Sequence, residues 1–228
     1  GNPGTEITFF DIPGLGRTYE GVSSISSTSL RVKNIESLIF WKKRFEQLNV
    51  SHEEITKRGN RDVLPFKDTE GTKLILVADN GETGVPPGKP WRTSDIPEEF
   101  AIVGLGPVTL TVKEALPTST ILTNILGFRH VGSYPSPNGD YPPIEVYATG
   151  EGGVGAEVHL EVRPDLPRER PGRGSVHHVA FRIPNEEEYH QWVDKIRATR
   201  LPNSGKVDRY YFKAFYFREP NGILFELS

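Results

Sequence analysis

Along the C-terminal stretch 209–226, hydrophobic and polar positions follow the period of two that is typical of β-strands. Residues 215–217 and 223–225 are aromatic or aliphatic and favour strands, and the turn-forming run Glu219-Pro220-Asn221-Gly222 separates them. In the second strand, Glu226 falls on the face opposite to Phe225. A carboxylate in such a strand either faces water at a sheet edge or needs a cation or a metal ion as partner, because burying an unpaired charge is costly.

Residues 177–183 predict a second strand with the same division of faces. Val179 and Phe181 point to the apolar face, and His178 points to the other. His178 and Glu226 therefore both lie on the less apolar face of a strand. One histidine and one carboxylate are two of the three ligands in a two-His-one-carboxylate metal site.

The same two periodicities predict the other elements and an α+β fold class. Asn34 and Asn185 are suited to cap two of the helices. Strands are expected near residues 5–10, 26–32, 62–66, 73–78, 107–112, 128–133, 144–148, 156–162, 207–218 and 222–227, and helices over 35–48, 118–126 and 186–197.

Paired landmarks recur at one fixed separation, which indicates an internal repeat. The pairs Asn34 and Asn185, Trp41 and Trp192, and Gly71 and Gly222 are each 151 positions apart. The spacing predicts a duplicated unit of one strand, one helix and three strands (βαβββ), with a weaker third copy over 107–162. His178, Tyr216 and Glu226 correspond to Ser27, Pro65 and Ile75, so the repeated unit does not itself require these three residues.

Composition narrows the chemistry. The 228 residues are 36% hydrophobic and 25% charged with a net charge of -3, which gives no reason to expect nucleic acid or a membrane as partner. The absence of cysteine excludes disulfides, thiol catalysis and thiolate ligands, so a metal site must use histidine and carboxylate. No signal peptide or long apolar segment is visible, and we expect a cytoplasmic protein. Because the chain lacks methionine and opens on Gly1, we expect its natural N-terminus to lie outside this sequence.

Several stretches resemble a known family. The βαβββ repeat and the pattern Phe215-Tyr216-x-x-Glu219-Pro220-x-Gly222-x-x-x-Glu226 resemble the vicinal oxygen chelate superfamily, which includes glyoxalases and extradiol dioxygenases. The segments GTEITFF, GRGSVHHVAFRIP and DRYYFKAFYFREPNGILFEL are similar to bacterial ring-cleaving dioxygenases that act on hydroquinones and are described as glyoxalase-family metalloproteins. The resemblance covers nearly all of the chain.

The resemblance implies repeated modules that form curved mixed sheets, with four modules in the complete fold. It implies that the first and fourth modules together hold the metal. We therefore expect the last strand of a truncated first module and a loop in 1–22, a second module in 23–80, a linker in 81–104, a third module in 105–163, a linker in 164–174 and a fourth module in 175–228.

The resemblance also implies site residues. His178 and Glu226 match the metal ligands of the fourth module, and the third ligand belongs to a part of the first module absent from this sequence. Tyr216, Arg209 and His177 match catalytic positions, the tyrosine and histidine for proton transfer and the arginine for anionic charge. Residues 207–209 stand where the usual extradiol pattern has a histidine, which fits the hydroquinone branch.

The remaining histidines are weighed against this set. His159 lies at the position equivalent to Glu226 in the third module and would supply a ligand if modules three and four paired. The alternative is a structural or exposed histidine. We interpret His52, His130 and His190 as non-ligands.

The function implied is an Fe(II)-dependent, extradiol-type dioxygenase with a small aromatic substrate and dioxygen as partners, and a homo-oligomer is compatible with the sequence. Mn(II), Zn(II), Ni(II) or Co(II) are alternative metals. Two other functions stay open: a glyoxalase-like lyase or isomerase that uses a divalent metal without oxygen, and a non-catalytic small-molecule binding protein of the same fold.

Overall fold

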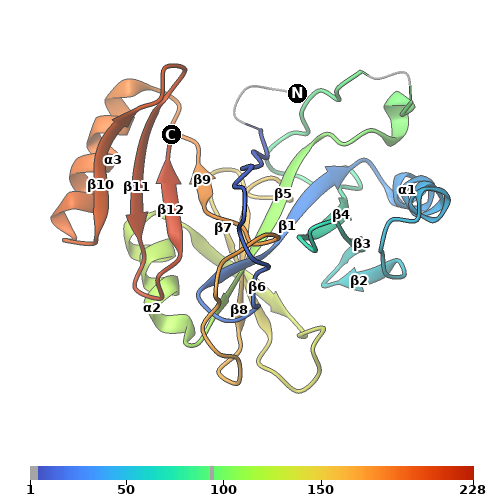
Figure 1. Ribbon diagram of the computed structural model, residues 1–228. Helices are drawn as coiled ribbons and strands as arrows, with labels where there is room; N and C mark the ends of the chain where they lie inside the picture. The colour runs from blue at the N-terminus through green and yellow to red at the C-terminus, as the bar shows by residue number, and fades with distance from the viewer. Residues whose placement is uncertain (1–4, 93–94) are drawn as a thin grey trace.

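A computed structural model describes residues 5–92 and 95–228, and one order of elements recurs along the chain (Figure 1). Three units result, the N-terminal, central and C-terminal units. The N-terminal unit contains β1 (Ser24–Val32), α1 (Ile35–Leu48), β2 (Thr56–Arg58), β3 (Arg61–Lys67) and β4 (Lys73–Ala78). The central unit contains β5 (Gly104–Val112), α2 (Ala115–Thr120) with a π-helical turn (Ile121–Ile125), β6 (Arg129–Tyr134), β7 (Ile144–Ala148) and β8 (Glu157–Val162). The C-terminal unit contains β9 (Val179–Phe181), α3 (Glu186–Ala198), β10 (Asn203–Asp208), β11 (Lys213–Arg218) and β12 (Leu224–Leu227). A short 3₁₀ turn, Glu98–Phe100, precedes the central unit.

The two predicted asparagine caps set the starts of α1 and α3. The Asn34 side chain accepts a hydrogen bond from the Ser37 amide at 3.2 Å, and Asn185 accepts one from the Glu188 amide at 2.9 Å.

The helical spacing of Leu38, Trp41, Phe45 and Leu48 predicts that all four lie on one apolar stripe of α1. For Leu48 this prediction is wrong, since this residue in the last turn is 58% exposed.

The strands form two mixed sheets. An eight-stranded sheet has the order β2-β3-β4-β1-β5-β8-β7-β6, and a four-stranded sheet has the order β10-β11-β12-β9. The N-terminal and central units share the larger sheet through the antiparallel pair β1 and β5, and the C-terminal unit forms the smaller one. The predicted α+β class with curved mixed sheets is confirmed. The alternative in which the central and C-terminal units share one sheet is wrong. β5 pairs with β1 of the N-terminal unit, and the C-terminal strands form a sheet of their own.

The repeat holds at the level of strand register. Thr28 pairs with Leu74 and Val179 pairs with Phe225, and both residues of the second pair lie 151 positions after those of the first. The same offset relates the antiparallel pair of β3 and β4 to that of β11 and β12, where Pro65 pairs with Ile75 and Tyr216 with Glu226.

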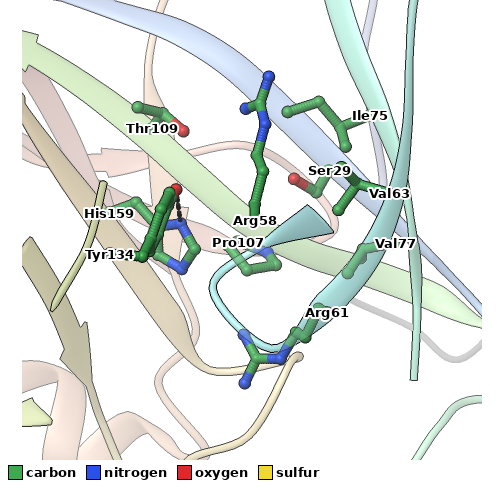
Figure 2. Close-up of a pocket in the computed structure, with 10 residues that line it drawn as sticks. All are labelled: Ser29, Arg58, Arg61, Val63, Ile75, Val77, Pro107, Thr109, Tyr134 and His159. Atoms are coloured by element: carbon green, nitrogen blue, oxygen red, sulfur yellow. Dashed lines mark hydrogen bonds between the residues drawn. The ribbon is translucent and has the colours of Figure 1, made fainter. Parts of the chain in front are cut away.

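Alternation along the strands gives the eight-stranded sheet two different faces. Leu64 and Leu76 point toward α1 and are fully buried. Val63 and Val77 point to the opposite face, where they line a pocket together with polar side chains (Figure 2).

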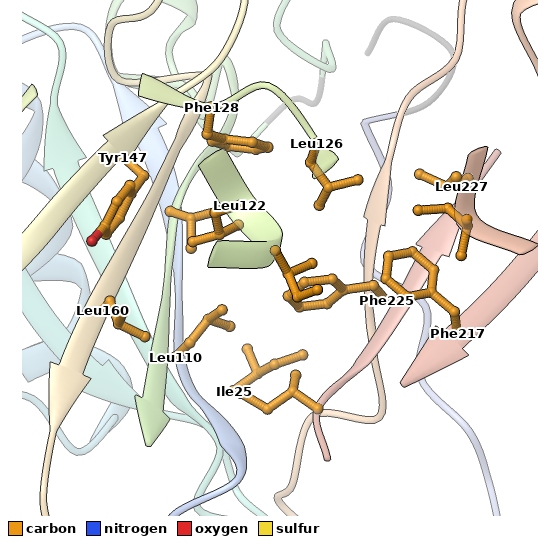
Figure 3. Packing of buried hydrophobic residues seen from close by; sticks show 14 of the residues in the cluster. Ile25, Leu110, Leu122, Leu126, Phe128, Tyr147, Leu160, Phe217, Phe225 and Leu227 are labelled. Atoms are coloured by element: carbon orange, nitrogen blue, oxygen red, sulfur yellow. The ribbon is translucent and has the colours of Figure 1, made fainter. Parts of the chain in front are cut away.

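One apolar core joins the two sheets. It contains Leu110 and Leu160 of the larger sheet, Leu122 of the π-helical turn and Phe217 and Phe225 of the smaller sheet, all fully buried (Figure 3). Because these residues come from both sheets, the C-terminal unit packs directly on the central unit.

Among the described residues, every helix is too short or too polar to span a lipid bilayer.

The segment before β1 differs from its prediction. Residues 5–10 form no strand and are exposed. Further along, Tyr19 and Val22 make isolated bridges to Arg170 and Arg168, so the loop lies against the basic linker. Residues 1–4 of the expected first module and residues 93–94 of the expected linker 81–104 lie outside the described residues.

Candidate metal centre

Glu226 lies near the middle of the four-stranded sheet. β12 runs between β11 and β9, and within it Glu226 pairs with Tyr216 on one side and Ala180 on the other. Its neighbour Phe225 faces the apolar core, so alternation turns the carboxylate to the opposite face. Glu226 is nevertheless only 3% exposed, so it is a buried carboxylate and requires a partner.

His178 is that partner. The His178 Nε2 atom lies 2.7 Å from Glu226 Oε2, and the imidazole side chain is 20% exposed. The predicted strand at 177–183 is shorter in the structure, and His178 stands one residue before β9, which begins at Val179. β9 is parallel to β12, and this pairing brings the two side chains together from positions 48 residues apart.

The other predicted site residues surround this pair. His177 Nδ1 lies 2.8 Å from His178 Nδ1, and the Tyr216 ring stands edge-on to the His178 ring with centroids 5.5 Å apart. The Arg209 guanidinium carbon lies 5.8 Å from the centre of the Tyr216 ring. The structure thus gathers all five residues on one face, together with Phe10, whose ring lies 5.8 Å from that of His177.

The pKa shifts of Glu226, Tyr216 and His177 indicate the protonation state of each side chain at neutral pH. Burial raises the pKa of Glu226, but the hydrogen bond and charge of His178, with further hydrogen bonds from Tyr216 and Ser228, outweigh burial and hold the pKa below its usual value. Burial and the Glu226 carboxylate raise the pKa of Tyr216. Burial and the charges of His178 and Arg218 lower the pKa of His177. At neutral pH the site therefore combines an anionic glutamate, a protonated tyrosine and a neutral histidine.

The donor set fits part of a metal centre. Imidazole nitrogen and carboxylate oxygen are ligands that divalent iron, manganese and zinc share, and the two are close enough to bind one ion together. Within residues 5–92 and 95–228, no group of three or more His, Asp or Glu side chains is arranged to hold a metal ion. His178 and Glu226 therefore offer two of the donor atoms that a metal ion would need.

His159 lies in the other sheet, away from this pair. It is 9% exposed, and its Nδ1 and Nε2 atoms lie 2.9 Å from Tyr134 Oη and 3.0 Å from Glu157 Oε2. Arg61 binds the same Glu157 carboxylate through two contacts of 2.5 and 2.8 Å. Sequence reasoning missed this network because its members come from two different units, and no local pattern links them.

Comparison of this sequence with known proteins identifies the family to which it is similar. A model described as "Glyoxalase/Bleomycin resistance protein/Dioxygenase superfamily" matches residues 104–227. The chain is 54% identical over 227 residues to a Bacillus subtilis protein named "Putative ring-cleaving dioxygenase MhqA", and the match covers all of this chain and 71% of that protein.

Two further comparisons extend this result. The chain is 26% identical over 238 residues to the "Chlorohydroquinone/hydroquinone 1,2-dioxygenase" of Sphingobium indicum, covering all of this chain and 69% of that protein. A crystal structure titled as a putative dioxygenase from Bacillus subtilis superposes with a TM-score of 0.80 at 29% identity, over 94% of this chain and 64% of that one. The chain thus spans about two thirds of the length of that solved structure.

Proposed function

The chain belongs to the Glyoxalase/Bleomycin resistance protein/Dioxygenase superfamily, and from that premise we propose that it acts as a metal-dependent ring-cleaving dioxygenase on hydroquinone-like aromatic compounds. We propose Fe(II) as the metal. The names of two relatives, a ring-cleaving dioxygenase at 54% identity and a hydroquinone 1,2-dioxygenase at 26%, support the reaction class.

The observation that carries the proposal is the contact between His178 and Glu226. A buried carboxylate 2.7 Å from an imidazole, at a position where the repeated unit has Ile75 instead, is not required by the fold of the unit. Buried ionisable groups with a specific charged partner concentrate at functional sites. In this proposal, His178 and Glu226 bind the metal, and the remaining ligand comes from outside the described residues.

The neighbouring side chains then have defined tasks. When His178 Nε2 binds a metal, its proton resides on Nδ1, and the neutral His177 Nδ1 at 2.8 Å accepts the resulting hydrogen bond and fixes the ring orientation. Tyr216 is protonated at neutral pH and adjoins both ligands, so it is placed to donate its proton to a substrate oxygen. Arg209, exposed beside Tyr216, stabilises anionic charge on the aromatic substrate.

Fe(II) would supply the electron transfer that links the aromatic ring to dioxygen. In the overall reaction, one ring carbon–carbon bond breaks and both oxygen atoms enter the product, so no external reductant is consumed. With Nδ1 accepting from His178, the neutral His177 carries its proton on Nε2, so His177 and Tyr216 both start as proton donors and regain protons as the phenolic groups of the substrate lose theirs.

The test is oxygen uptake by the complete protein, loaded with Fe(II) under anaerobic conditions, after addition of a substituted hydroquinone. We expect uptake stoichiometric with substrate in the wild type and none in His178→Ala. His190→Ala is the matched control, because His190 is a histidine of the same unit whose side chain contacts Glu186 and Tyr189 of α3 and Lys206 of β10. It should behave as the wild type.

Absence of oxygen uptake by the iron-loaded protein would contradict the proposal. If iron is bound and neither hydroquinones nor catechols cause oxygen uptake, the dioxygenase proposal fails. Metal-dependent turnover without oxygen would then indicate a lyase or isomerase of the glyoxalase type.

A further inference from the structure

A second polar pocket lies on the eight-stranded sheet, on the face opposite to α1 and α2. Residues from β1 to β6 and β8 and the β2–β3 hairpin surround it (Figure 2). Its polar members include Arg58, Arg61, Thr109, Tyr134 and His159. None of these residues belongs to the candidate metal centre on the smaller sheet.

Strand register makes this pocket the internal counterpart of the candidate metal centre. Glu226 pairs with Ala180 in the C-terminal unit, and the equivalent pairs are Ile75 with Ser29 and His159 with Thr109. All four of these equivalent residues line the pocket. The position of Glu226 therefore recurs here twice, occupied by a different residue type each time.

That chemistry does not suit a metal ion. Both nitrogens of His159 are engaged, one with Tyr134 and one with Glu157. Burial lowers the pKa of His159, so the imidazole is neutral. The Glu157 carboxylate is already paired with Arg61, whose second contact is Glu82 at 2.6 Å.

Among the charged residues that line the pocket, Arg58 is the one without a carboxylate partner. Arg61 has two carboxylate partners, whereas Arg58 forms no side-chain hydrogen bond or ion pair with any of the described residues, and its Nε atom is buried without a partner. Glu161, a nearby buried carboxylate, accepts hydrogen bonds from Thr111 and Asn138 instead. A buried guanidinium donor without an acceptor costs free energy, which a bound anion would recover.

We propose that this pocket binds one small monovalent anion on Arg58, a halide or the carboxylate group of a small molecule. One unmatched positive charge calls for one negative charge. The free space of about 20 Å³ accommodates a group of about the size of a water molecule. The hydroxyl groups of Ser29 and Thr109 line the same space and are available as further donors (Figure 2).

Anion-dependent thermal unfolding of the complete protein tests this proposal. Sodium chloride or sodium acetate is titrated against sodium HEPES at constant ionic strength, so that screening is the same throughout. We expect a saturable rise in Tm of roughly 2–4 °C with at least one of the two anions. The anion that saturates at the lower concentration identifies the ligand as halide or carboxylate.

Two variants isolate Arg58. Arg58→Gln should remove the saturable rise without lowering Tm in the absence of anion, because it removes a guanidinium whose buried Nε atom has no acceptor. Lys43→Gln is the matched control, since it removes one positive charge from an exposed position on α1 of the same unit and should keep the full rise. In crystals soaked in sodium bromide, an anomalous peak should lie within hydrogen-bonding distance of the Arg58 guanidinium.

The proposal is overturned if neither anion gives a saturable rise in the wild type, or if Arg58→Gln keeps the rise in full. It is also overturned if Arg58→Gln lowers Tm equally with and without anion, because Arg58 would then have a structural partner instead of a ligand.

Discussion

Glu226 occupies a position that is buried in all three units, although its residue type differs in each. The equivalent residues Ile75 and His159 are 4% and 9% exposed, and Glu226 is 3% exposed. The fold therefore fixes the burial of this position, and the side chain decides what it does. Isoleucine contributes apolar contacts, histidine joins a hydrogen-bond network, and glutamate beside His178 supplies a metal ligand in our proposal.

At the same scale, Glu157 predicts a pH-dependent contribution to stability. Burial opposes its charge, but the hydrogen bonds from Arg61 and His159 and the charge of Arg61 lower its pKa from 4.5 to about 2. A lowered carboxyl pKa means that the unfolded chain binds the proton more readily. The stabilisation is therefore complete above the unfolded pKa near 4.5 and is lost as the pH falls through about 2.

Glu157→Gln should accordingly reduce the free energy of unfolding by roughly 2–3 kcal/mol at pH 7. The same difference should be found at pH 6 and should shrink steadily below about pH 4.5. Urea unfolding of both proteins at several pH values measures it. Glu187→Gln, at an exposed position on α3, is the control, and a difference that grows on acidification would refute the assignment.

At the scale of elements, the sequence was most informative where local chemistry decides the structure. Asn34 and Asn185 each cap a helix by a hydrogen bond within three residues, and both predicted helix starts are confirmed. Residues 5–10 have strand composition but no strand, because a strand requires hydrogen bonds from a neighbour that composition does not reveal. Arg58 and His159 approach each other only through the pairing of two units, which no local pattern predicts.

An ion pair between β1 and the end of β4 connects the N-terminal unit to the linker that follows it. Arg31 and Asp79 are 3% and 5% exposed, and their side chains are 2.6 Å apart. Arg31 also donates hydrogen bonds to the carbonyl groups of Val85 and Pro86. This pair fixes the path of the chain as it leaves β4.

Asp79→Ala should lower the free energy of unfolding by about 3–5 kcal/mol, because Arg31 would remain as a buried charge without its partner. Asp62→Ala breaks the exposed pair of Asp62 and Lys57, at 3.1 Å, and should cost less than about 1 kcal/mol. Chemical denaturation of the two variants gives both values. Equal losses would show that burial of the Arg31–Asp79 pair is not what matters.

At the scale of the whole molecule, the C-terminal unit is held to the rest by packing. Phe217 and Phe225 of the smaller sheet share one core with Leu110 and Leu160 of the larger sheet, and Ile25 of β1 extends that core into the N-terminal unit. The candidate metal centre lies on the opposite face of the smaller sheet from this core. The shared core therefore supports the strands that carry Glu226 and Tyr216.

The fluorescence of two tryptophans can show whether the N-terminal and C-terminal units unfold together. Trp41 lies on α1 and Trp192 on α3, and the third tryptophan, Trp91, is 76% exposed. In a variant that retains only Trp41 and in one that retains only Trp192, the fluorescence midpoint in urea should coincide with the far-UV circular-dichroism midpoint of the same variant, because the shared core makes unfolding cooperative. A fluorescence midpoint that differs from the circular-dichroism midpoint would show that the units unfold independently.

The measurement that tests the central claim most directly is Fe(II) bound per chain in the complete protein after anaerobic loading and gel filtration. We predict that the wild type and Glu187→Gln bind Fe(II) alike. Glu226→Gln should lower the affinity by more than about 100-fold, beyond the loss expected for a residue that only orients a ligand. Full retention of iron by Glu226→Gln would contradict the assignment of Glu226 and His178 as the metal-binding pair.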